Sequence, residues 1–207
     1  MVENMKPDKK ELILNAAEEL MSVMPDSDIS IQLIAAKAGI GKGSIYYYFC
    51  SKEEILDSVI SRCYKKALHE YFCEINSCET TLEKIKKLFE CMIQKEFHDK
   101  QQNFIISLHL RDDLMLHHKM KIVAMEEVAP VLTELLIQGN EEGSLHTDTP
   151  EESAEMIVAV ITFLFDRSVF PWDNKKTAKK LKLFADVLET CLHTEKGSFD
   201  FLYRLIV

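Results

Sequence analysis

The sequence has no long hydrophobic run. Its longest, from Ile157 to Phe165, spans nine residues and includes Thr162, whereas a membrane-spanning helix needs roughly 20 apolar residues. The N-terminus mixes Glu3, Asp8 and Glu11 with its lysines and has no apolar stretch of signal-peptide length. We therefore expect no membrane partner and a cytoplasmic location.

Cysteines at the spacing of metal or redox motifs are also missing. None of the six cysteines forms a CxxC pair, which removes the usual signatures of structural zinc and of dithiol redox centres. Asp113 and His117 lie four residues apart on a predicted helix, but no third ligand stands at motif spacing. We predict reduced thiols, no metal ion and no cofactor.

Positive charge is scarce over the whole chain. Its 25 Lys and Arg residues face 34 Asp and Glu residues, for a net charge of -9. This balance excludes a protein that coats nucleic acid or anionic membrane over its entire surface. Residues 1–66 are nearly neutral, with nine basic against ten acidic side chains. A local nucleic-acid site in this part of the chain is therefore compatible with the composition.

Helix-breaking residues are few and unevenly placed. No proline occurs between Pro25 and Pro130, and three of the six glycines are Gly39, Gly41 and Gly43. Apolar residues recur at i, i+3 and i+4, without sustained period-two alternation, so the fold class is predicted to be all-α. The expected helices span residues 8–23, 31–38, 42–48, 52–75, 80–98, 101–116, 119–139, 151–169 and 175–194.

Residues 29–55 contain the most specific pattern. Ser30 is placed to cap the helix that follows it, and Gly39 to end that helix, because glycine accepts the left-handed conformation of a C-terminal cap. After a short turn comes a two-turn helix, and Ser51 and Glu54 then form an S-x-x-E capping box for the next one. Helix, tight turn and second helix are the layout of a helix-turn-helix.

The two-turn helix over 42–48 has two different faces. Ile45 and Phe49 are four residues apart and can pack inward, which leaves Lys42, Ser44, Tyr46 and Tyr47 facing outward. A DNA groove offers thymine methyl groups, base edges and phosphate oxygens to such side chains. The alternative is that the tyrosines are core residues of a small three-helix domain. The glycines match neither the Walker phosphate loop nor the GxGxxG dinucleotide motif.

The stretch from Lys9 to about Leu56 resembles the DNA-binding domain of TetR-family transcriptional regulators. The resemblance lies in ILNAAEELM (13–21), ISIQLIAAKAGIGKGSIYYYF (29–49) and SKEEIL (51–56). It implies an all-helical homodimer with a helix-turn-helix DNA-binding domain over 1–51 and a larger ligand-binding and dimerisation domain over 52–207. It also implies a repressor, not an enzyme, that a small-molecule effector releases from a palindromic double-stranded operator.

The resemblance assigns roles to individual residues of the helix-turn-helix. Base contacts would fall on Lys42, Gly43, Ser44 and Tyr46, and phosphate contacts on Tyr48 and Lys52. Tyr47 is a candidate for both kinds of contact. Ser30, at the start of the first of the two helices, completes the predicted DNA-binding set.

Two further sites are predicted in the C-terminal part. Apolar stripes on the last two long helices suit a dimer interface of two helices from each subunit: Ile157, Val160, Ile161, Leu164, Leu181, Phe184 and Leu188. Large adaptable apolar side chains suit a largely apolar effector: Phe89, Met92, Phe104, Leu108, Met120 and Phe163. Three alternatives stay open, namely stripes that form only the chain's own core, an effector-independent DNA-binding protein of the same fold, and a helical enzyme.

Overall fold

The computed structural model describes residues 8–93, 114–166 and 169–205, and those residues form helices without a strand. The all-α fold class is thus confirmed. The elements are α1 (Lys9–Val23), η1 (Asp26–Asp28), α2 (Ile31–Ala38), α3 (Lys42–Tyr48), α4 (Lys52–Asn76), α5 (Thr81–Ile93), α7 (Leu114–Glu142), α8 (Pro150–Ala159), the π-helical turn η3 (Val160–Leu164), α9 (Asn174–Cys191) and α10 (Phe201–Arg204). Among the described helices, none is long and apolar enough to cross a membrane.

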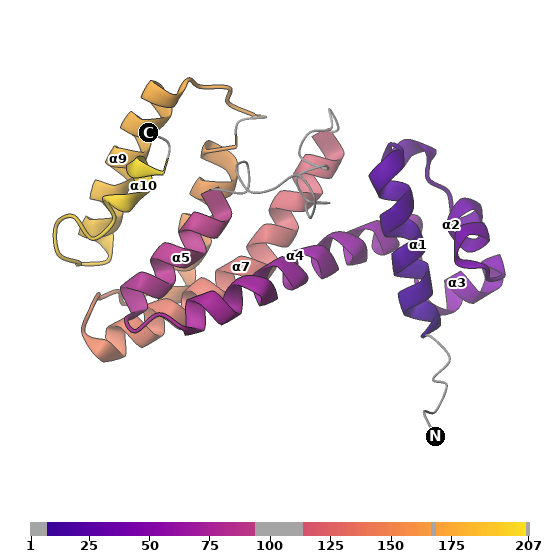
Figure 1. Ribbon diagram of the computed structural model, residues 1–207, viewed down its shortest axis with the longest axis horizontal. Helices are drawn as coiled ribbons and strands as arrows, with labels where there is room; N and C mark the ends of the chain where they lie inside the picture. Colours follow the sequence, from indigo (N-terminus) through magenta and orange to yellow (C-terminus); the bar gives the residue numbers. More distant parts are fainter. Residues whose placement is uncertain (1–7, 94–113, 167–168, 206–207) are drawn as a thin grey trace.

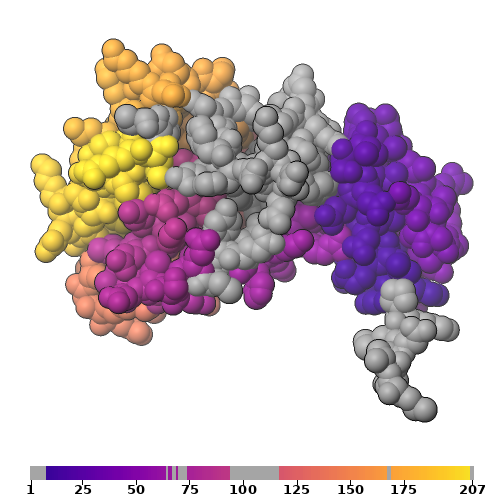
Figure 2. Space-filling model, in the orientation of Figure 1, coloured from indigo at the N-terminus to yellow at the C-terminus, as the bar shows by residue number. Residues whose placement is uncertain are grey.

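The N-terminal helices α1, α2 and α3 form a separate lobe at one end of the molecule (Figures 1 and 2). One face of each helix packs into the apolar core of this lobe. Ile13, Ile34 and Ile45 are completely buried there. This core does not stop at residue 52, because Ile55 and Ile60 of α4 are also buried in it. The DNA-binding domain predicted over 1–51 therefore shares its core with the first turns of α4.

Helix α4 connects this lobe to the rest of the chain (Figure 1). Its 25 residues correspond to about 37 Å at the rise of an α-helix. Near its other end, Ile75 is buried in a second core. That core lies among α5, α7, α8, α9 and α10, and its largest buried side chains are Phe89 and Phe199.

Helix α7 belongs to both cores. Met120, Val123 and Ala124 are buried in the N-terminal core, whereas Val128 and later residues are buried in the C-terminal one. The predicted break between helices at residues 117–118 is wrong, because α7 runs through it from Leu114 to Glu142. Neither histidine there breaks a helix, and burial of the His117 side chain holds this turn in place. The predicted helix over 101–116 falls largely outside the described residues.

Helix α8 ends earlier than the predicted 151–169. Its α-helical part stops at Ala159, a π-helical turn follows, and the chain has left the helix at Phe165. Tertiary contacts explain the difference, because Phe163 packs edge-on against Phe170 at 5.5 Å between ring centroids. Asp166 also pairs with Lys121 of α7 at 2.7 Å. Both contacts lie where the chain leaves the helix.

Candidate nucleic-acid interface

Helix α2 has a defined start and a defined end. At its start the Ser30 hydroxyl accepts a hydrogen bond from the Leu33 N–H at 3.2 Å, as the sequence predicts. At its end Gly39 has φ +67°, a left-handed conformation that glycine adopts without strain. The Ile40 N–H then donates to the Ala35 carbonyl at 3.0 Å. These caps fix the tight turn that places α3.

Helix α3 is too short to be stable by itself, since isolated helices below about 12 residues are marginal in water. It has seven residues, and its cap residue Gly41 makes no side-chain hydrogen bond. Ile45 is completely buried and Phe49 is 3% exposed, both in the N-terminal core. Packing of this inward face therefore positions α3.

The opposite face of α3 is open to solvent. Tyr47 is 84% exposed and Tyr46 is 52% exposed, which is unusual for aromatic side chains. The Lys42 ammonium lies 5.9 Å from the Tyr46 ring centroid. Ser44 is half-buried beside them. The predicted outward set is therefore brought together on one surface, and Tyr46 and Tyr47 are not core residues.

Tyr48 and Lys52, the other predicted phosphate contacts, lie at the edge of this surface. Tyr48 is half-buried against the N-terminal core and packs edge-on to Tyr47, with 5.0 Å between ring centroids. The Lys52 ammonium donates to the Asp26 carbonyl at 2.9 Å. Lys52 thus ties the start of α4 to the η1 turn, and an ammonium has two further N–H groups for another acceptor.

The start of α4 is closed by the predicted capping box. The Glu54 N–H donates to the Ser51 hydroxyl at 3.1 Å, and the Glu54 carboxylate accepts from the Cys50 N–H at 2.5 Å. Hydrogen bonding to its own backbone N–H lowers the pKa of Glu53, and the nearby Lys52 charge lowers it further. Glu53 is therefore ionised at neutral pH, a negative charge beside Lys52.

Gly43 has no packing reason to be a glycine. A Cβ built on it meets no atom within 4 Å, and its φ is not positive. Glycine inside a helix costs about 0.5–1 kcal/mol relative to alanine. The missing side chain leaves room for another molecule to approach the α3 backbone closely.

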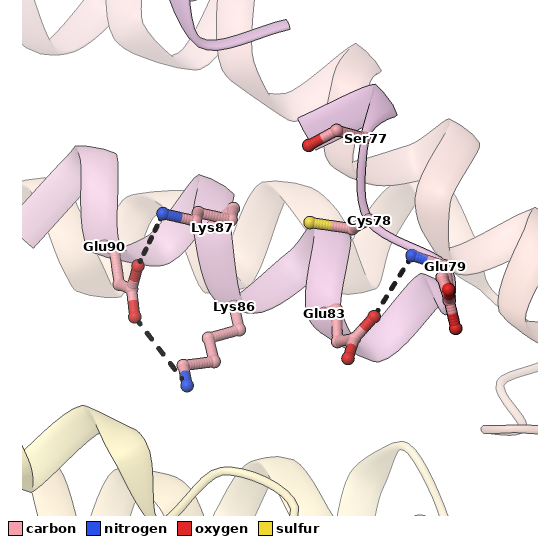
Figure 3. Close-up of a pocket in the computed structure, with 7 residues that line it drawn as sticks. All are labelled: Ser77, Cys78, Glu79, Glu83, Lys86, Lys87 and Glu90. Carbon is pink, nitrogen blue, oxygen red and sulfur yellow. Dashed lines mark hydrogen bonds and ion pairs between the residues drawn. The ribbon is translucent and has the colours of Figure 1, made fainter. Parts of the chain in front are cut away.

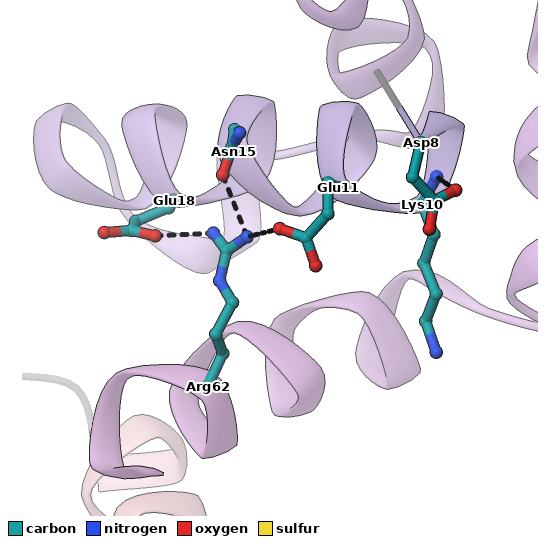
Figure 4. Close-up of polar contacts among 6 residues, drawn as sticks. All are labelled: Asp8, Lys10, Glu11, Asn15, Glu18 and Arg62. Carbon is teal, nitrogen blue, oxygen red and sulfur yellow. Dashed lines mark hydrogen bonds and ion pairs between the residues drawn. The ribbon is translucent and has the colours of Figure 1, made fainter. Parts of the chain in front are cut away.

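The core beneath α3 is linked to α4 by a charged cluster (Figure 4). The Arg62 guanidinium of α4 points at α1 and donates to Glu11 and Asn15 at 2.8 Å each, and to Glu18 at 2.6 Å. Next to it, burial raises the pKa of the Cys63 thiol to about 12, and the Glu18 charge adds to the effect. Sequence reasoning did not single out Arg62, because its partners are 44 to 51 residues away.

Comparison with known proteins identifies this architecture. Residues 13–59 match the profile of bacterial regulatory proteins of the tetR family, and residues 96–187 match that of the tetracyclin repressor-like C-terminal domain. The two matches together cover more than half of the chain. The chain belongs to the TetR family.

Individual relatives match about 30% of this TetR-family chain. The HTH-type regulator EthR of Mycobacterium tuberculosis is 38% identical over 60 residues, 29% of this chain and 28% of EthR. The uncharacterised HTH-type regulator YhgD of Bacillus subtilis is 36% identical over 62 residues, 30% of this chain and 32% of YhgD. The matches span about a third of the length of these relatives.

Two solved structures share the whole fold. The fatty acid degradation regulator FadR of Bacillus halodurans aligns with a TM-score of 0.56 and 21% identity, over 98% of this chain and 96% of FadR. RolR in complex with resorcinol aligns with a TM-score of 0.66 and 15% identity, over 96% of this chain and 92% of RolR. At these identities the likeness concerns the fold alone.

The structure describes four of the six predicted effector residues and places them apart from one another. Phe89 is completely buried and Met92 half-buried in the C-terminal core, but Met120 is buried in the N-terminal core. Phe163 is 52% exposed, with the Lys121 ammonium 5.9 Å from its ring. Phe104 and Leu108 lie outside the described residues. The four of these residues that the structure describes therefore do not line a single pocket.

A surface hollow between the end of α4 and α5 does not suit an apolar effector (Figure 3). Its walls carry Glu79, Glu83, Lys86, Lys87 and Glu90, next to Ser77 and Cys78. Glu90 pairs with both lysines, at 3.9 and 3.7 Å. Over the described residues no group of three potential ligands could hold a metal ion, His117 included.

The predicted dimer residues need correction. Ile157, Ile161, Leu181 and Leu188 are at most 5% exposed and pack in the core of their own chain, so they are not available to a second one. Phe184 is half-buried, with its ring centroid 5.8 Å from that of Phe165; Val160 and Leu164 are also half-buried.

The exposed apolar side chains of the same helices lie on a different stripe. Met156 is 70% exposed, Phe163 52%, Leu183 64% and Val187 45%. Leu183 and Val187 are four residues apart on α9 and share a face of that helix, and Phe163 follows Met156 across the π-helical turn. This second stripe is visible in the sequence, but only the structure distinguishes it from the stripe that faces the core.

Proposed function

We propose that this TetR-family chain is a DNA-binding transcriptional regulator that contacts operator DNA through the outward face of α3. The observation that carries the proposal is the pair of exposed tyrosines, Tyr46 and Tyr47, held next to the buried anchor Ile45. A helix of this kind fits the major groove of B-DNA, where hydroxyl groups and rings meet base edges and thymine methyl groups. Lys42 and Lys52 supply charge for phosphate contacts.

The proposed protein acts as a homodimer. Met156, Phe163, Leu183 and Val187 expose apolar area that a second copy would cover, which supports an interface formed by α8, η3 and α9. A symmetric dimer binds a palindrome whose half-sites are about one helical turn or a multiple of it apart.

The finer proposal is a cytoplasmic repressor that a small, largely apolar effector releases from DNA. The match of residues 96–187 to the tetracyclin repressor-like C-terminal domain supports an effector-binding role for this part. RolR, a structure of the same fold, holds resorcinol. The second candidate is a DNA-binding protein of this fold that has no effector; the separate placement of the four described pocket residues, Phe89, Met92, Met120 and Phe163, favours it.

Selection of duplexes from a random pool tests DNA binding. Wild-type protein is expected to enrich a palindrome, whereas Tyr47→Ala, which removes an 84% exposed side chain, is expected to enrich it less strongly and with relaxed preference at particular base pairs. Val23→Ala is a matched control, since Val23 is 74% exposed at the end of α1, outside the helix-turn-helix. A wild-type protein that enriches nothing at low salt contradicts the proposal.

Titration of the complex with a metabolite panel separates the two candidates. The complex of the protein with its selected duplex is titrated with small apolar and aromatic compounds, and DNA release is followed by fluorescence anisotropy. Release by one compound class, with saturation, supports the effector-controlled repressor. Binding that no compound weakens supports the effector-independent protein.

A further inference from the structure

The first turns of α7 contact three parts of the molecule at once. On one side Met120, Val123 and Ala124 are buried in the N-terminal core. Cys63 of α4 packs against the same core. The N-terminal lobe therefore includes the first turns of α7, which lie about 60 residues after Cys63 in the sequence.

Polar contacts fasten the same turns to α4. The Lys119 ammonium pairs with the Asp57 carboxylate at 3.1 Å. The Glu127 carboxylate accepts from the Ser61 hydroxyl at 2.6 Å and pairs with Lys65 at 3.2 Å. Because Arg62 fastens α4 to α1, the helices α1, α4 and the start of α7 are joined by side-chain bonds as well as by packing.

The remaining contact of these turns is with the end of the α8 and η3 segment. Lys121 pairs with Asp166 at 2.7 Å, and both side chains are well buried, at 18% and 9% exposed. Five of the nine residues from Lys119 to Glu127 thus bind the lobe through side chains in its core or on α4, while Lys121 forms an ion pair with the segment after η3.

Helix α7 also has a point at which its two halves can flex. Pro130 lies inside it, and a proline cannot donate the backbone hydrogen bond to the residue four positions earlier. That residue, Glu126, lies between Ala124, which is buried in the N-terminal core, and Val128, which is buried in the C-terminal core. A second attachment on the N-terminal side of Pro130 therefore limits the movement of the lobe.

We propose that the Lys121–Asp166 ion pair is a positioning contact that fixes the DNA-binding lobe relative to the dimerisation helices. The inference rests on the proposed function, since it matters only if two lobes of a dimer bind one operator. A dimer with firmly held lobes binds two half-sites at one spacing. Loss of the pair lets each lobe take several positions, so the dimer tolerates other spacings, while contacts within each half-site stay the same.

Spacing discrimination measures this effect directly. The probes are the palindrome that wild-type protein selects, the same palindrome with one or two base pairs inserted at its centre, and a duplex with one half-site. The ratio of affinities for the original and the lengthened palindrome is expected to fall at least fivefold in Lys121→Met and in Asp166→Asn. Affinity for the single half-site is expected to stay within twofold of wild type.

Three variants keep the test decisive. Lys87→Met removes an ion pair between α5 and α4 that does not reach α7, and is expected to keep the wild-type ratio. Lys121→Met can unfold because it leaves a buried charge, but the double change Lys121→Met with Asp166→Leu replaces the pair by apolar side chains, which cores usually tolerate. Tyr47→Ala is expected to weaken binding at all spacings alike.

The outcomes distinguish the inference from the proposed function. A folded Lys121→Met or double variant whose spacing ratio stays within twofold of wild type overturns the positioning role, with DNA binding intact. Equal losses on the palindrome and on the single half-site overturn it too, because the change then acts within the half-site. If wild-type protein selects no duplex, the proposed function itself fails.

Discussion

The Arg62 guanidinium donates to the Glu18 carboxylate at 2.6 Å and so joins α4 to α1 (Figure 4). Glu11 accepts a second bond from the same guanidinium at 2.8 Å. Helix α1 forms one wall of the core on which α3 rests, whereas α4 leads into the C-terminal part. The bonds therefore fix the position of α1, which supports α3, relative to α4, which connects the two cores.

Removal of this guanidinium is expected to destabilise the N-terminal lobe. Arg62→Gln loses three hydrogen bonds to polar or charged groups, and because the carboxylates are partly exposed we expect a loss of about 1–2 kcal/mol in the free energy of unfolding. Arg204→Gln is the control, since its pair with Asp200 at 3.7 Å is mostly exposed. Urea unfolding checks both. Equal losses in the two variants would contradict the role of Arg62.

Gly43→Ala is expected to separate stability from DNA binding. Because the site is helical and open, the methyl group should raise the free energy of unfolding by up to about 1 kcal/mol. The same methyl group would enter the space between α3 and the groove, and affinity for the selected duplex should fall. Thermal unfolding and anisotropy measure the two changes. Unchanged affinity would show that Gly43 does not face DNA.

Lys52→Ala is expected to weaken binding without changing sequence preference. Loss of one phosphate contact should reduce the slope of log affinity against log salt by about one, on selected and scrambled duplexes alike. The variant also loses the bond to the Asp26 carbonyl, which costs about 0.5–1.5 kcal/mol of stability. Lys196→Ala, on an exposed loop of the C-terminal part, should keep the slope. A changed base preference with an unchanged slope would reject the phosphate role.

Leu183→Asp is expected to split the dimer and leave the fold intact. Leu183 is 64% exposed, so the chain itself tolerates a charge there, but an interface would bury that charge without a partner. Phe184→Asp would be ambiguous, because Phe184 packs against Phe165 in the same chain. Sedimentation velocity gives the mass. A dimer that persists in folded Leu183→Asp protein would place the interface elsewhere.

Local sequence signals were sufficient for the helix-turn-helix. Capping by Ser30, the left-handed turn at Gly39 and the box formed by Ser51 and Glu54 act over two to four residues, so the bounds of α2 and α3 were predicted as the structure has them. The inward side chain of Ile45 also follows from helical periodicity alone.

Contacts between distant segments were not accessible in the same way. The stripe through Leu181 and Leu188 was predicted to face a second chain, but a stripe does not indicate which neighbour covers it, and here the chain covers it itself. The end of α8 depends on Lys121 and Asp166, and the place of Met120 in the N-terminal core depends on the path of α7. Such relationships need the tertiary structure.

The central claim is that the outward face of α3 contacts base pairs. The most direct test measures the affinity of Tyr47→Ala for a set of duplexes that together carry every single base-pair change in the selected palindrome. We expect the variant to keep wild-type stability, since Tyr47 is 84% exposed, and to lose about 1–3 kcal/mol per half-site. The loss should be confined to particular base pairs, at which the variant no longer discriminates. A Tyr47→Ala protein with wild-type affinity and wild-type preference at every position would contradict the account.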